Sequence, residues 1–279
     1  MSEASRGDGA GKLLFAGRFP RDAVRATLLA VPRPTTPELE ALIERRWRAA
    51  VERAARDGRE LFDGAPLRLA ELPVVHSASS SVELKVARSS YRDFVGTNLA
   101  QAESTAALAA RPADRGGRYP WHCFGNAIGT SALVLTADGI VVAGRRSERV
   151  FGLPGWLHGF GGMLEADDSR AAGATVDVFA SMERELEEEL GLAPSDLSEL
   201  VLLGALREPR CDQPELLFAA TTRLTRAALS TRFAGAPSRS EHAALVDLPR
   251  TAAARAMALD RLERVSPVTY ACSRLLGDR

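Results

Sequence analysis

The sequence predicts an α/β fold in which helices cover a mixed sheet, and three observations favour it. Short runs of branched and apolar residues predict strands in both halves of the 279-residue chain. One long amphipathic helix is embedded among the later strands, and two further helices close the chain. This mixed order is typical of an α/β sandwich rather than of a doubly wound parallel sheet.

The first long element is a helix predicted over residues 37–56. Pro37 suits the first turn of a helix because it directly follows Thr36. Apolar residues recur at helical spacing and form one stripe, which comprises Leu39, Leu42, Ile43, Trp47, Ala50 and Val51. We therefore expect this helix to pack one face against the rest of the protein.

Two short strands are predicted next, over residues 67–75 and 82–87. A Ser-rich turn at 76–81 separates them and suggests a hairpin. Residues 101–110 predict another helix. The following stretch, 111–117, is rich in Pro, Gly and charge and is therefore the candidate domain boundary.

This boundary divides the chain into parts of different character. We expect a disordered tail over residues 1–12, an N-terminal α+β extension over 13–120 and a catalytic domain over 121–279. The last part contains the predicted strands, which cover residues 128–135, 140–144, 200–207, 215–222 and 243–246. A turn at Asp138-Gly139 joins the first two of these strands.

Bulk composition excludes several functions. Lys+Arg and Asp+Glu number 36 each, so no overall positive charge favours nucleic-acid binding as the main activity. No segment approaches the ~20 apolar residues of a membrane span, and the first residues lack the apolar core of a secretory signal. Cys123, Cys211 and Cys272 fit no metal-ligand spacing and are interpreted as free thiols. These features favour a cytoplasmic protein.

The most informative segment is the acidic stretch at residues 184–192. Apolar residues recur at helical spacing and give one buried face, namely Phe179, Met182, Leu186 and Leu190. Glu185, Glu188 and Glu189 are three or four residues apart, so they share another face. Gly191 follows at the position expected for a C-terminal glycine. Clustered carboxylates repel one another, and a hard divalent cation relieves that repulsion.

Residues 184–192 match the pattern Arg-Glu-apolar-x-Glu-Glu-x-Gly-apolar at every specified position. This is the second half of the signature of the Nudix hydrolases, and the chain resembles that superfamily here. The resemblance implies a Nudix α/β/α sandwich with a mixed sheet, preceded in this chain by the α+β extension. It also implies hydrolysis, with Mg²⁺ or Mn²⁺, of the diphosphate in a nucleoside diphosphate linked to another moiety X.

The same resemblance implies roles for individual residues. Glu185, Glu188 and Glu189 would be the metal ligands and catalytic carboxylates. Arg184 would orient a glutamate through a salt bridge. An upstream glycine-rich loop, residues 159–162, would supply the carbonyl of Gly161 as a further ligand.

The chain departs from the signature upstream of the helix. Asp168 stands where the family has a glutamate after Gly162, and we leave it out of the core site. Fifteen residues separate Asp168 from Arg184, where the family has seven. Residues 165–176 are therefore interpreted as an insertion.

The N-terminal part carries a second resemblance. Residues 60–64 and 90–98 are similar to the equivalent region of the Nudix UDP-glucose/UDP-galactose diphosphatases, which also have an N-terminal extension and a lengthened signature loop. This resemblance implies a nucleotide-sugar substrate that is cleaved to UMP and sugar 1-phosphate. Arg92 and Asn98 are candidate substrate-binding residues. The alternative is that residues 91–98 form a turn that packs the extension against the core.

Two later residues complete the candidate site. Glu241, just before a predicted strand, is a candidate additional carboxylate for metal or water, because Nudix enzymes often draw one from a late loop. Arg207 ends a predicted strand, and its planar guanidinium suits phosphate binding. Trp121, Phe124 and Trp156 are interpreted as core or interface residues. His122, His158 and His242 show no metal-cluster spacing and are interpreted as structural.

Two other functions compete with UDP-sugar hydrolysis. One is a Nudix hydrolase of ADP-ribose or dinucleoside polyphosphates, because loops outside the catalytic helix select the base and X. The other is a Nudix-fold binding module without catalysis. Retention of all three helix carboxylates argues against the module.

Overall fold

The computed structural model describes residues 11–59, 61–100, 120–150, 152–165 and 174–278. The predicted helix at 101–110, the candidate boundary at 111–117 and nearly all of the predicted tail lie outside these residues. So do Asp168 and most of the predicted insertion. The division of the chain into three parts therefore stays a prediction.

A seven-stranded mixed sheet forms the centre of the protein. Its neighbouring strands, in spatial order, are β1 (Lys12–Phe19), β10 (Leu197–Arg207), β11 (Pro214–Thr222), β6 (Gly129–Leu135), β7 (Val141–Arg146) and β12 (His242–Leu248). The short β8 (Leu157–His158) also pairs with β7. β11 and β6 run parallel, whereas the other described pairs are antiparallel. The predicted mixed α/β sheet is thus confirmed.

A second mixed sheet comes mainly from the N-terminal part. Its strand order is β3 (Leu67–Leu69), β5 (Ser81–Arg88), β2 (Val24–Leu29) and β9 (Thr175–Val176), with β4 (Val74–His76) also pairing with β5. β4 and β5 form the predicted hairpin. The two sheets exchange strands along the sequence, because β1 joins the central sheet and β9 joins the second one.

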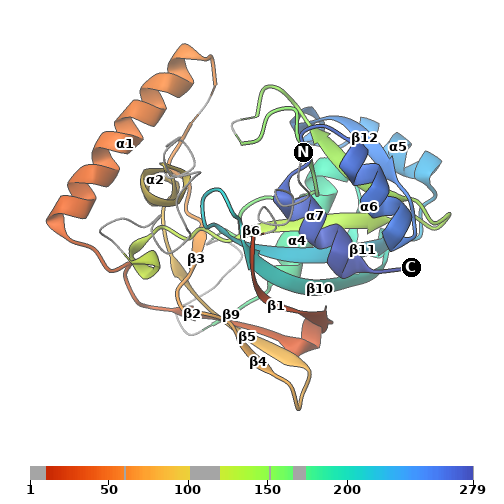
Figure 1. The fold of residues 1–279 in the computed structure, drawn as a ribbon, viewed down its shortest axis with the longest axis horizontal. Coiled ribbons are helices and arrows are strands. Elements are labelled where there is room, and N and C mark those ends of the chain that lie inside the picture. Colours follow the sequence, from red (N-terminus) through yellow and green to blue (C-terminus); the bar gives the residue numbers. More distant parts are fainter. Residues whose placement is uncertain (1–10, 60, 101–119, 151, 166–173, 279) are drawn as a thin grey trace, which may run out of the picture.

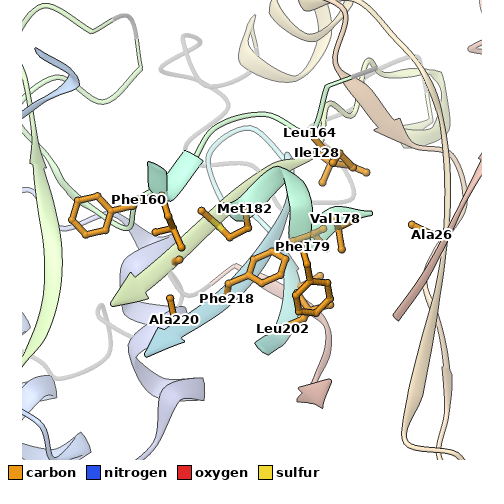
Figure 2. Packing of buried hydrophobic residues seen from close by; sticks show 14 of the residues in the cluster. Ala26, Ile128, Phe160, Leu164, Val178, Phe179, Met182, Leu202, Phe218 and Ala220 are labelled. Atoms are coloured by element: carbon orange, nitrogen blue, oxygen red, sulfur yellow. The ribbon is translucent and has the colours of Figure 1, made fainter. Parts of the chain in front are cut away.

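Helices cover both faces of the central sheet. α4 (Val178–Leu190) and α5 (Arg226–Ala234) contribute to one core, which the second sheet also joins. α6 (Ala252–Arg261) and α7 (Pro267–Leu276) bury the opposite face. Figure 2 shows Phe179 and Met182 of α4 beside Phe218 of β11. The predicted α/β/α arrangement with an N-terminal addition is therefore confirmed.

α1 (Pro37–Arg56) and α2 (Tyr91–Phe94) lie at the far end of the molecule from α6 and α7 (Figure 1). The first has the predicted bounds, and Thr36 caps it by accepting a hydrogen bond from the Leu39 amide. A π-helical turn, Val95–Leu99, continues α2 and packs against α1. Gly96 permits this close approach, since a Cβ there would lie 2.7 Å from Ile43.

Some elements differ from the sequence-based expectation. The prediction of a single strand over residues 67–75 is wrong. The chain leaves the sheet between β3 and β4, because Pro73 there has no N–H to donate. β1, β2 and α5 were not predicted at all. All three cysteines are free, as expected. Of the helices in the described ranges, none combines the length and apolarity needed to cross a membrane.

Candidate active site

The acidic helix α4 is defined by its ends. Asp177 caps its N-terminus by accepting hydrogen bonds from the amides of Phe179 and Ala180 at 3.0 and 3.1 Å. Gly191 ends it in the left-handed conformation, with φ of 68°. The predicted apolar face is fully buried, as the sequence pattern required. These constraints fix which residues of α4 face the rest of the protein.

The three predicted metal ligands lie on one side of α4 at different depths. Glu189 and Glu185 are 1% and 9% exposed, whereas Glu188 keeps a partly exposed side chain. Nη1 of Arg184 lies 3.1 Å from Oε1 of Glu185 and 3.6 Å from Oε2 of Glu188. Arg184 is thus within ion-pair distance of two carboxylates, and its role in orienting a glutamate stays a prediction.

The glycine-rich loop packs directly on these carboxylates. The amide of Gly161 donates a 2.7 Å hydrogen bond to Oε2 of Glu189. Gly161 has φ of 146°, and a Cβ there would lie 2.2 Å from the Thr130 carbonyl. A Cβ on Gly162 would lie 2.7 Å from Oε1 of Glu185. Glycine is therefore needed at Gly161, and a side chain at position 162 would displace the Glu185 carboxyl group. The observed contact uses the amide of Gly161; the ligand role of its carbonyl stays a prediction.

Glu241 approaches the same site from a distant part of the chain. It ends a 3₁₀ turn, Arg239–Glu241, that precedes β12. The Ser238 amide before this turn donates a 2.7 Å hydrogen bond to the Glu188 carbonyl. Burial raises the pKa of Glu241, and the negative charge of Glu189 raises it further. The predicted late carboxylate therefore lies in the electrostatic field of α4.

His242 was interpreted as structural, yet it contacts a predicted ligand. Its side chain is fully buried, and its Nε2 lies 3.2 Å from Oε1 of Glu189. Space for the ring exists because Gly144 has no side chain; a Cβ there would lie 2.2 Å from Nδ1 of His242. The sequence offered one signal that went unused, namely that His242 directly follows Glu241.

Burial and neighbouring negative charges make it unfavourable for the carboxyl groups of this site to ionise without a counter-ion. Burial raises the pKa of Glu185 to about 8, against the opposing charge of Arg184, and the nearby glutamates raise it further. Oε1 of Glu189 accepts no hydrogen bond from a described residue, although His242 lies close to it. Such oxygen donors fit a hard divalent cation. Within the described ranges, however, no three His, Cys, Asp or Glu side chains already converge as a metal cage.

The three candidate substrate-binding residues lie elsewhere and already have partners. Asn98 is fully buried; its amide group donates to Oδ1 of Asn126 and to the Cys211 carbonyl, each at 3.1 Å. Arg92 lies 3.2 Å from Glu44. These contacts favour the alternative that residues 91–98 pack the extension against the core.

Arg207 is also held by its neighbours. Its guanidinium lies 3.0 Å from Oδ2 of Asp212 and stacks on the ring of Trp121, 4.7 Å from the centroid. The indole of Trp121 in turn donates to the Asp212 carbonyl. Trp121 therefore acts here as a packing residue, in agreement with its interpretation. Binding of a phosphate by Arg207 stays a prediction.

Comparison with known proteins supports the signature. No family model matches the chain. Uridine diphosphate glucose pyrophosphatase NUDT22 from Homo sapiens is 32% identical over 160 residues, which cover 53% of this chain and 52% of that protein. The protein of the same name from Mus musculus is 29% identical over 156 residues, 52% of this chain and 50% of that one. The chain thus spans about half the length of these curated relatives.

Solved structures show a weaker likeness. The NUDIX domain of Shewanella oneidensis NrtR, solved in complex with ADP ribose, is 12% identical and covers 59% of this chain and 96% of that chain, with a TM-score of 0.38. The sequence relatives and the residues of α4 thus agree with the resemblance of this chain to the Nudix hydrolase superfamily.

Proposed function

We propose that this protein hydrolyses the diphosphate linkage of a nucleoside diphosphate attached to a second moiety, with a divalent cation as cofactor. One observation carries the proposal. Glu185, Glu188 and Glu189 gather on one face of α4, two of them buried, against the loop of Gly161 and Gly162. This arrangement concentrates oxygen donors where the protein itself supplies little compensating charge.

The cation fits these donors by its chemistry. When bound, Mg²⁺ or Mn²⁺ would neutralise charge on the diphosphate and lower the pKa of a water nucleophile. Glu185, Glu188 and Glu189 would hold it. Arg184 would keep Glu185 oriented, and the Gly161 amide would fix Glu189. The protein therefore contributes position and charge more than covalent chemistry.

Glu241 is our candidate for accepting the proton of the attacking water. It comes from a different element than the three ligands, and its raised pKa brings it closer to neutral pH, where general bases work best. Arg146 and His242 act to lower the pKa of Glu241, so they partly offset the effects of burial and of Glu189.

For the substrate, we propose a UDP-sugar, with UDP-glucose and UDP-galactose as the first candidates. Support comes from the resemblance of residues 60–64 and 90–98 and from the names of the relatives, uridine diphosphate glucose pyrophosphatase. The products would be UMP and a sugar 1-phosphate.

A substrate panel tests both levels of the proposal. Purified protein would be incubated with UDP-glucose, UDP-galactose, ADP-glucose, ADP-ribose and diadenosine polyphosphates, with and without Mg²⁺, and products resolved by chromatography. Metal-dependent release of UMP from UDP-sugars is the expected result. Preference for an adenine substrate would contradict the UDP-sugar assignment alone. Absence of turnover on every compound would contradict hydrolysis and favour a binding module.

A further inference from the structure

Glu215, at the start of β11, is a buried carboxyl group that the proposed reaction has not used. The residue is 7% exposed. Within the described parts of the chain its carboxyl group forms neither a hydrogen bond nor an ion pair. Burying a polar group without a partner costs free energy. The contacts of the described residues therefore give no structural reason for glutamate at this position.

The neighbouring strand makes room for this carboxyl group. Glu215 pairs with Gly129 in the parallel register of β11 and β6. A Cβ on Gly129 would lie 2.4 Å from both carboxylate oxygens, so any other residue would displace them. The side chain of Glu215 thus lies across the backbone of Gly129, in a space that only glycine leaves open.

The charges around Glu215 do not compensate it. Burial, followed by the negative charge of Glu208, raises the pKa of Glu215 to about 8; Arg210 and Arg146 oppose this rise. Arg210 is already committed, because its Nε lies 2.5 Å from Glu208 and its guanidinium stacks on Trp156. A pKa of about 8 favours the protonated form of Glu215 at pH 7, and a protonated carboxyl group both donates and accepts hydrogen bonds.

Glu215 is connected to the candidate active site in two ways. Thr130, next to Gly129 on β6, donates from its amide to the carbonyl of Gly162 at 2.8 Å, and Gly162 packs on Glu185. Arg146 at the end of β7 acts electrostatically on both Glu215 and Glu241. The backbone of Gly129, against which the Glu215 carboxyl group lies, is thus paired with the loop that supports the candidate metal ligands.

We propose that Glu215 is a specificity-determining residue, whose carboxyl group binds an uncharged polar group of the substrate that both donates and accepts hydrogen bonds. Adjacent hydroxyls of a sugar and the imide edge of a pyrimidine have this chemistry. The inference rests on the proposed function and adds the recognition of one substrate moiety to it. It excludes direct binding of the diphosphate by Glu215, because Glu208 adds negative charge there.

Two substitutions of similar size test this role. Glu215→Gln keeps one donor and one acceptor, whereas Glu215→Leu removes both. At pH 7 we expect Glu215→Leu to raise KM for UDP-glucose roughly tenfold, the equivalent of one hydrogen bond, with a smaller change in kcat. Glu215→Gln should stay near the wild type. Unchanged KM in a folded Glu215→Leu variant would overturn the proposal.

The pH profile keeps the test decisive if Glu215→Leu does not fold. As pH rises from 7 to 9, wild-type Glu215 ionises and loses its donor, so KM should rise. Glu215→Gln cannot ionise and should lack this component. Titration of Glu185, Glu241 and the substrate is common to both proteins, so the difference reports on Glu215. Identical profiles would overturn the proposal.

Calorimetric binding of UDP and UDP-glucose, without metal, separates the remaining possibilities. Weaker binding of UDP-glucose alone by Glu215→Leu would assign the contact to the sugar, and weaker binding of both would assign it to the nucleoside. A wild-type protein that binds UDP-glucose without cleaving it would contradict the proposed hydrolysis, while the Kd comparison would still test Glu215. Equal Kd values in wild type and Glu215→Leu would overturn the inference.

Discussion

Where α1 meets α2, acidic and basic side chains alternate in contact, whereas Glu185 and Glu188 on α4 share the guanidinium group of Arg184. The N-terminal network comprises Arg33, Glu40, Glu44, Arg92 and Asp93, all within ion-pair distance of a partner of opposite charge. Although burial raises the pKa of Glu40, hydrogen bonds from Thr35 and Arg33 lower it overall. Charge in this region is balanced by the protein itself.

The same type of residue behaves differently on α4. Glu185 is buried beside Arg184, yet its pKa is raised to about 8 because burial outweighs that one cation and other glutamates lie nearby. A balanced network stabilises the fold and needs no ligand. An unbalanced one costs stability until a cation arrives, which is typical of a functional site. The contrast is the basis for placing the proposed cation site on α4, and substitutions on α4, at Glu215 and in the N-terminal region test it.

The largest effect is expected from Glu189→Gln. Loss of a buried carboxylate fixed by Gly161 should lower kcat on the order of a thousandfold, comparable to removal of a key electrostatic group. Circular dichroism should show an intact fold. The matched control is Glu187→Gln, an exposed residue of the same helix, which should retain activity. Full Mg²⁺-dependent turnover by Glu189→Gln would show that the unbalanced cluster is not the active site.

The second effect concerns stability and pH. The pKa of Glu215 is about 8 in the folded protein against an ordinary value of 4.5, so the folded state holds this proton more tightly. The tighter binding of this proton contributes its full stabilisation of the folded state below pH 4.5. That contribution decreases as the pH rises above 4.5 and is lost once the pH passes 8. Relative to the wild type, Glu215→Gln should therefore gain stability between pH 5 and 9, on the order of a few kcal/mol. Urea denaturation at several pH values measures this, and parallel curves would contradict it.

Asn98→Ala should affect the balanced region. The substitution leaves the buried Asn126 amide and the Cys211 carbonyl without the partner that Asn98 supplies. We expect a loss of about 1–3 kcal/mol in the free energy of unfolding. Because these contacts are structural, KM for the best substrate should change little in the folded fraction. A large rise in KM without destabilisation would instead support the predicted substrate-binding role of Asn98.

The smallest effect is expected from Arg92→Ala. Arg92 pairs with Glu40, Glu44 and Asp93 but remains partly exposed, so its removal should cost about 1 kcal/mol of unfolding free energy. Arg45→Ala, which removes an exposed arginine of the neighbouring helix α1, is the control and should be near neutral. Loss of substrate affinity in Arg92→Ala alone would show that the balanced network also contacts substrate.

Local patterns predicted those parts of the site that depend on one element. The face shared by Glu185, Glu188 and Glu189, and the end of α4 at Gly191, follow from helical spacing and glycine geometry, which are properties of consecutive residues. Glu241 could be placed near them only by resemblance, because the turn that carries it reaches α4 through tertiary contacts.

The sequence patterns did not predict contacts between residues that lie on distant strands. Nothing near Glu215 in the sequence indicates that Gly129 leaves space for its carboxyl group, since the register of β6 and β11 decides it. His242 likewise reaches Glu189 because Gly144 lies opposite. β1 was not predicted for the same reason. Exposed and buried residues do not alternate along it, and its pairing with β10 defines it as a strand.

The exchange of strands between the two sheets has a consequence for synthesis. β1 is made early, yet its partner β10 lies in the last third of the chain, and β2 waits for β9. Both strands therefore leave the ribosome with an unpaired edge, and neither sheet reaches its final form until most of the chain has been translated. Folding dominated by such distant pairings is slow and exposes strand edges to other molecules. We expect nascent chains that stop before β10 to be substrates for chaperones and proteases.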